Sequence, residues 1–180
     1  MTPLAVLQFW RDEVGAARWF ADVPALDAEI RGRFEPLWRD ACAGRLDGWE
    51  DSPDGALALA IVLDQFPRNM FRGQAQAFAS DRQARAVAGR AIARDFDLHV
   101  PTALRPFFYM PLMHSEDLAD QDRCIALFAE RIGPDTYNLP YARRHRAEIA
   151  RFGRFPGRNA ALGRIPTGEE TAYLAAGPAH

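Results

Sequence analysis

The stretch Ala56-Leu-Ala-Leu-Ala-Ile-Val-Leu63 decides the fold of this chain. Every residue in it is apolar, so a helix made from it has no polar side to turn towards water. Such a helix lies inside a core. We therefore predict that residues 56–63 form the central and most buried helix. Asp64 and Gln65 follow, and Pro67 predicts that the helix ends at these polar residues.

Helical patterns flank this stretch on both sides. Ser80–Gln83 and Thr167–Glu170 each fit a capping box, and Ser115 can cap a further helix. No Asn-Gly or Asp-Gly turn joins alternating apolar runs, so strands are poorly supported. The sequence predicts an all-α fold of about seven or eight helices, packed as antiparallel neighbours. The flanking helical segments are residues 4–20, 26–43, 80–92, 115–133, 140–152 and 167–177.

Length and composition indicate one compact multi-helix domain, residues 1–180. No run approaches the roughly 18 apolar residues of a membrane-spanning helix, so we expect no membrane association. The N-terminus lacks the basic region of a secretory signal. Cys42 and Cys124 match no metal or redox spacing, which favours reduced cysteines and a cytoplasmic location.

Charge is distributed unevenly along the chain. All 22 basic residues are arginine, and a compositional bias accounts for this more simply than selection for guanidinium chemistry. Residues 141–165 hold seven arginines and one acid, a local charge of +6, so the remainder carries −8. A basic patch on an acidic protein predicts a specific anionic partner more than general binding of polyanions.

Four of the seven arginines in residues 141–165 belong to one loop. Its sequence is Arg151-Phe-Gly-Arg-Phe-Pro-Gly-Arg-Asn159, and it continues to Arg164. Gly153 and Pro156 exclude a regular helix, while Phe152 and Phe155 require burial. A loop anchored by aromatic side chains and carrying arginines predicts an ordered anion-recognition surface. Its candidate ligand-binding residues are Arg154, Arg158, Asn159 and Arg164.

Asp64 is the first candidate for chemistry. A carboxylate at the C-terminal end of a buried helix meets the negative end of the helix dipole and poor solvation. The sequence therefore predicts an ion pair to Arg68, Arg154 or Arg158. A structural salt bridge and a functional carboxylate both stay open. Gln65, Arg68 and Arg72 are candidate ligand-binding residues beside it.

Two histidines are candidate acid/base groups with Asp64. His114 follows a buried apolar run, and His145 lies on the helix that leads into the arginine loop. Each could instead be a satisfied core histidine. Glu116 and Gln121 join the ligand-binding set, since the Gln121 amide falls on an apolar stripe and needs a partner. His114 and Glu116 lie two residues apart and no Glu-x-x-His pair occurs, so we predict no metal and no cofactor.

Long motifs of this chain together resemble the bacterial domain-of-unknown-function 924 family. The resemblance implies an all-helical fold similar to tetratricopeptide-like superhelices, and it implies no established activity. The chain departs from the family loop, usually Phe-Pro-His-Arg-Asn, at Gly157. The matching stretches are residues 63–69 with Arg72-Gly73, residues 109–116 with Asp120-Gln121, His145, residues 152–159 with 162–164, and residues 167–170.

Two functions follow as hypotheses. The first is a pocket for a small anionic molecule, a carboxylate or a phosphate, which a hydrolase or transferase could use with His114 or His145 as acid/base. The second is a helical module that docks a protein or an RNA, with the arginine motifs mainly structural. Convergence of the candidate residues on one concave, partly solvated site favours the first. Arginines paired to buried acids make the motifs structural, and arginines spread across a convex face favour a macromolecular partner.

Overall fold

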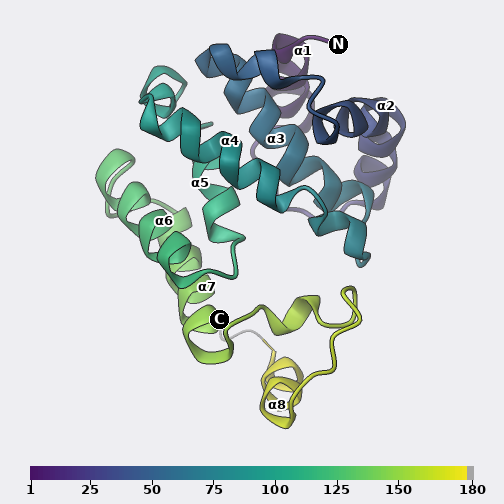
Figure 1. Ribbon diagram of the computed structural model, residues 1–180, viewed down its shortest axis with the longest axis vertical. Helices are drawn as coiled ribbons and strands as arrows, with labels where there is room; N and C mark the ends of the chain where they lie inside the picture. The colour runs from purple at the N-terminus through teal and green to yellow at the C-terminus, as the bar shows by residue number, and fades with distance from the viewer. Residues whose placement is uncertain (178–180) are drawn as a thin grey trace.

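A computed structural model describes residues 1–177, which are helical and contain no strand (Figure 1). The predicted all-α fold is confirmed. Short turns of π-helix (Phe9–Val14) and 3₁₀-helix (Asp47–Asp51, Ala75–Phe78, Phe96–His99, Pro156–Arg158) join the main helices. The α-helices of the described residues are α1 (Pro3–Gln8), α2 (Pro24–Cys42), α3 (Pro53–Met70), α4 (Asp81–Ala93), α5 (Pro106–Met113), α6 (Leu118–Arg131), α7 (Asn138–Phe152) and α8 (Gly168–Ala176).

Helix α3 is the centre of the architecture. It packs against α1, α2, α4 and α5, while α6 packs against α5 and α7. One cluster of buried apolar side chains extends from Val6 to Ala142. The loop after α7 and the short α8 lie at the opposite end of the molecule from α1 (Figure 1). This loop returns towards α3 and α4, which brings the predicted arginine motif close to Asp64.

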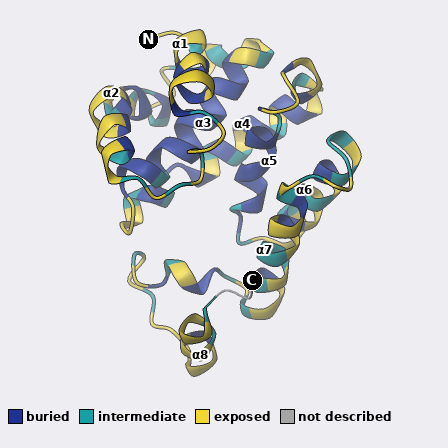
Figure 2. Cartoon of the chain, turned by 180° about the vertical axis from the view of Figure 1, so that it is seen from behind, coloured by how far each residue is buried: buried dark blue, intermediate teal, exposed yellow. Residues whose placement is uncertain are grey.

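Burial of α3 agrees with the prediction for residues 56–63. Each residue from Gly55 to Pro67 is buried, whereas α8 is largely exposed (Figure 2). Gly55 is required at the start of this helix, since a Cβ there would lie 2.1 Å from the Trp49 carbonyl oxygen. None of the described helices is both long enough and apolar enough to span a membrane.

The prediction that this helix ends before Pro67 is wrong, because α3 continues to Met70. Proline has no N–H to donate to the carbonyl oxygen of Leu63, four residues earlier, which would leave that buried oxygen without a partner. Ser80 Oγ donates to it at 2.6 Å, and Trp38 Nε1 donates to Ser80 Oγ at 2.9 Å. A side chain from outside the helix therefore lets a proline stand inside it.

Ser80 stands at the N-cap position of α4, as predicted, but its side chain makes no capping hydrogen bond, so the capping box Ser80–Gln83 does not form. Gln83 Nε2 donates to the Cys42 carbonyl at 2.9 Å, so both residues of the motif connect α4 to neighbouring helices. The capping box of α8 is confirmed: Thr167 Oγ1 accepts from the Glu170 backbone, and the Glu170 carboxylate accepts from the Thr167 backbone.

Two other predicted boundaries also differ. The helix predicted over residues 4–20 ends at Gly15, whose φ of 73° favours glycine, and an irregular segment follows. Helix α6 begins at Leu118 with Asp117 as its cap, whereas Ser115 Oγ accepts from the Asp117 backbone and donates to Asp120. The irregular segment after Gly15 matters below, because it forms one wall of the site.

Replacing Ser80 by Ala should lower the free energy of unfolding by about 1–3 kcal/mol, because the Leu63 oxygen loses a buried donor and Trp38 Nε1 an acceptor. Pro67→Ala supplies a backbone N–H that can reach the Leu63 oxygen. The double variant should therefore lose less stability than the two single losses added together. Urea unfolding of the four proteins measures this coupling, and strictly additive losses would contradict the account.

Candidate functional site

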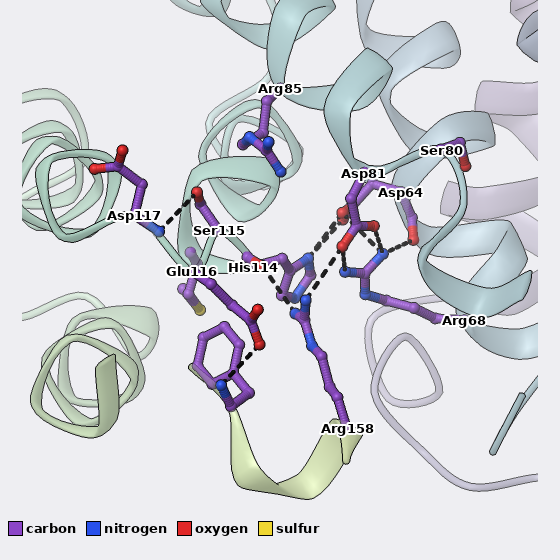
Figure 3. Close-up of polar contacts among 12 residues, drawn as sticks. Asp64, Arg68, Ser80, Asp81, Arg85, His114, Ser115, Glu116, Asp117 and Arg158 are labelled. Carbon is purple, nitrogen blue, oxygen red and sulfur yellow. Dashed lines mark hydrogen bonds and ion pairs between the residues drawn. The ribbon is translucent and has the colours of Figure 1, made fainter. Parts of the chain in front are cut away.

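Asp64 lies at the centre of a buried polar cluster (Figure 3). It is 1% exposed, and its Oδ1 lies 2.8 Å from His114 Nδ1 and 3.1 Å from Arg68 Nη1. Gln65 Nε2 donates to its other oxygen at 2.5 Å. The predicted ion pair is thus made with Arg68. Its predicted cause needs correction, because α3 runs past Asp64 and the carboxylate is not at the helix end.

Neighbouring charges keep Asp64 ionised. Burial opposes the charge, but the charge of Arg68 and the hydrogen bonds from His114 and Gln65 outweigh it and lower the pKa of Asp64 to about 2. The pKa of His114 is also lowered, by burial and by Arg68, against the opposing effect of Asp64. A neutral His114 facing an ionised carboxylate must carry its proton on Nδ1 and donate it to Asp64. Its Nε2 is then a hydrogen-bond acceptor.

His145 reaches the same protonation state by a different contact. Its Nδ1 lies 2.8 Å from the Tyr141 carbonyl oxygen, which can only accept, so Nδ1 carries the proton. Burial lowers the pKa of His145 to about 4, and the ring is therefore neutral at pH 7. The two imidazole centroids are 6.5 Å apart. The pair accordingly offers two acceptor nitrogens and no positive charge.

These side chains border a cavity of about 460 Å³. It brings together five of the predicted site residues: Gln65, Arg68, Arg72, His114 and His145. Asp64 lies directly behind His114. The remaining lining consists of Trp19, Phe20, Ala21, Asn69, Met110, Met113, Tyr137, Asn138 and Tyr141.

The two arginines of the cavity are already engaged with acids. Arg68 donates to both oxygens of Asp81, at 2.8 and 3.0 Å. Arg72 holds Asp27 through Nε and Nη2, at 2.8 and 2.9 Å, and its Nε also lies 3.4 Å from the exposed carboxylate of Asp22. The Arg72 side chain stays 45% exposed, and its Nη1 makes no hydrogen bond to the described part of the chain. Arg72 is therefore the guanidinium best able to meet a further anion.

Sequence analysis missed the aromatic wall of the cavity. Phe20 and Tyr137 are 57% and 68% exposed, which is unusual for such large side chains. Phe20 falls at the end of the helix predicted over residues 4–20, but the chain is irregular there. Trp19 Nε1 donates to the Trp10 carbonyl at 2.7 Å and holds this segment against the core. No pattern in the sequence marks the wall, since it depends on where the irregular segment runs.

Four predicted ligand-binding residues instead build the loop after α7. Arg154 pairs with Glu170 at 2.6 Å, and Asn159 Nδ2 donates to the same carboxylate at 3.3 Å. Arg164 pairs with Glu116 at 2.9 Å, and Glu116 also accepts from the Phe155 backbone at 2.8 Å. These residues do not line the cavity. Their contacts hold the loop in one conformation.

The local charge of +6 is therefore largely balanced within the fold. Five of the seven arginines in residues 141–165 form ion pairs with acids that lie outside that range. The expectation of an open basic patch over this segment is not met. The acids concerned are Asp81, Glu116, Asp122, Glu169 and Glu170.

Arg158 connects this loop to the back of the cavity (Figure 3). Its Nη2 donates to the His114 carbonyl at 2.8 Å, and its Nη1 lies 3.4 Å from Asp81. The guanidinium sits over the rings of Phe78 and Phe155, 4.7 and 4.5 Å from their centroids. Burial and the charge of Arg68 lower the pKa of Arg158 to about 10. The residue positions His114 and does not itself line the cavity.

The surroundings of Gln121 and Gly157, two further positions of the predicted motifs, are also defined. Gln121 donates to the carbonyls of Met113 and Ser115, at 2.6 and 2.7 Å, and so closes the turn that follows His114. Gly157 has open space where a Cβ would be, so its backbone does not require glycine. Within residues 1–177, no group of three or more His, Cys, Asp or Glu side chains could hold a metal ion.

We expect Asp64→Asn to destabilise the fold by about 3–5 kcal/mol, because it removes the buried carboxylate that Arg68 and His114 share and leaves Arg68 with Asp81 alone. The folded pKa, about 2, lies below the ordinary 3.8. This contribution is therefore complete above about pH 4 and is lost as the pH falls towards 2.

Chemical denaturation between pH 2 and pH 7 measures both effects. The wild type should lose stability over the lower part of this range, and Asp64→Asn should show a flatter profile there. Asp81→Asn is the matched control, because it removes a carboxylate from Arg68 without touching His114. A profile for Asp64→Asn as steep as that of the wild type would contradict the assignment.

Comparison with known proteins agrees with this architecture. Residues 6–178 match the model of the family described as bacterial protein of unknown function (DUF924). The chain is similar to the solved structure of a protein of unknown function from Agrobacterium tumefaciens, with 41% identity, a TM-score of 0.91 and 97% of each chain covered. Comparison with curated proteins gave no match. A family match over nearly the whole length, with a similar structure at this identity, shows that the chain belongs to the DUF924 family.

Proposed function

We propose that the cavity binds a small molecule with an anionic group, a carboxylate or a phosphate. The observation that carries this proposal is the composition of the cavity wall. A partly open volume of about 460 Å³ is bordered by aromatic and methionine side chains and by a few polar groups that converge from distant parts of the sequence. Small-molecule sites commonly have this size and this mixture of groups.

The anionic group belongs at the end of the cavity formed by Arg68 and Arg72. Arg72 keeps donor capacity beyond its pair with Asp27, and a guanidinium can hold an oxyanion through two N–H groups. Asp27 and Asp81 neutralise part of the local positive charge. We therefore expect saturable binding of modest affinity. Arg158, first assigned to the anion, acts through the His114 carbonyl in this proposal.

The histidine end of the cavity has the opposite preference. His114 and His145 present acceptor nitrogens, so they repel an oxyanion and favour a hydroxyl, an amine or a water that donates a hydrogen bond. An ionised Asp64 behind His114 holds its tautomer and would stabilise the imidazolium formed on proton uptake. A hydrolase or transferase would use His114 Nε2 as general base.

One observation favours the alternative, a helical module for protein or RNA. The loop arginines are mostly paired within the fold, as a mainly structural motif requires. Phe155 is buried and Phe152 packs on Tyr173, so neither ring lies free for base stacking.

Tetratricopeptide-like packing and a cytoplasmic location remain parts of the proposal. The two cysteines are free thiols, which agrees with a reducing compartment.

Thermal unfolding in the presence of phosphate, sulfate and small carboxylic acids tests the proposal. At about ten times its dissociation constant, a bound anion should raise the melting temperature by about 3–6 °C in a saturable way. Arg72→Ala should remove the response. Arg90→Ala is the matched control, because Arg90 holds Glu50 through the same two-point contact away from the cavity.

The rise in melting temperature must exceed the rise that chloride causes at equal ionic strength. The small-molecule function fails if no anion of the panel does so, or if Arg72→Ala and Arg90→Ala respond like the wild type.

A further inference from the structure

A second hollow of about 460 Å³ adjoins the proposed cavity. Five residues line both, so the two hollows share a wall. We infer that the ligand is amphiphilic, with an anionic head in the first cavity and an alkyl or aryl tail in the second hollow. This inference rests on the proposed function and specifies the class of molecule.

The two hollows differ sharply in polarity. Arg68, Arg72, His114 and His145 all belong to the first cavity. The lining residues of the second hollow are alanine, proline, aromatic residues and a single asparagine, and none is an acid, an arginine or a histidine. A molecule that spans both meets cationic groups at one end and an apolar surface at the other. That gradient matches an acid with a hydrocarbon tail.

The shared wall is exposed where it would contact such a tail. Phe20 is 57% and Tyr137 68% exposed, so both rings keep a large apolar surface open to water. Trp19 meets Phe107 edge to face with 5.0 Å between centroids, and Phe20 lies 6.4 Å from the same ring. The floor of the second hollow is therefore anchored in the core. An apolar tail lying across it would remove these rings from water.

The position of the wall also favours a small molecule over a second protein chain. The apolar surface does not stand alone, because it continues into a cavity that ends at buried charged groups. Tyr137 and Tyr141 border the first cavity, and their hydroxyl groups lie 2.8 Å apart. The residues common to both linings mark where a tail would cross from one hollow to the other.

A series of straight-chain acids, butyrate, hexanoate and octanoate, tests the inference by isothermal titration calorimetry. Affinity should rise about fourfold for each added methylene group that enters the second hollow. Ala103→Trp fills that hollow from an exposed position and should weaken octanoate at least tenfold while leaving butyrate unchanged. Ala17→Trp blocks it from the other side, should Ala103→Trp fail to fold.

Ala93→Trp is the matched control, since Ala93 is exposed and lies in neither hollow. It should bind the whole series as the wild type does. Equal affinity for butyrate and octanoate overturns the tail site alone and leaves the anion cavity standing. Octanoate binding that a folded blocking variant does not weaken overturns it too. If no acid of any length binds, the tail site fails, and the anion cavity fails with it only if phosphate and sulfate also leave the melting temperature unchanged.

Discussion

A carboxylate inside the most buried helix is the constraint on which the rest of this structure depends. Helix α3 has no solvent-facing side near Asp64, so an ionised group there must be paired or it would destabilise the fold. Arg68, one turn along the same helix, supplies the charge, and His114 supplies a second hydrogen bond. Each of these partners is held in turn by another element of the chain.

The ion pair between Asp64 and Arg68 is linked to contacts in more distant parts of the chain. Arg68 pairs with Asp81, the first residue of α4. Asp81 also lies near Arg158, which belongs to the loop after α7. Arg158 also donates to the carbonyl of His114, so these contacts lead back to the partner of Asp64. The loop reaches this position because Glu116 and Glu170 bind its other arginines. The arginines of this motif are thus mostly paired within the fold, and Arg158 contacts the backbone of the histidine.

Sequence reasoning found the helical fold and the central helix, because an unbroken apolar run leaves few alternatives. It also singled out Asp64, His114 and His145, which the fold brings together, since polar groups beside apolar runs must be paired or functional. It failed at Pro67 and Ser80, where a distant hydroxyl replaces the missing backbone donor. It also did not distinguish the arginines of the loop after α7, which pair with acids within the fold, from Arg68 and Arg72, which line the cavity. Those pairings join residues up to 77 positions apart, which no local pattern reveals.

The central claim is that buried Asp64 fixes His114 as a neutral acceptor facing the cavity. Nuclear magnetic resonance of the ring nitrogens in ¹⁵N-histidine-labelled protein tests it directly, with His114 assigned by its loss in His114→Gln. At pH 7 we predict a proton on Nδ1 and none on Nε2, a state that persists below the ordinary histidine pKa of 6.5. A His114 ring protonated on Nε2 at pH 7, alone or together with Nδ1, would contradict the account.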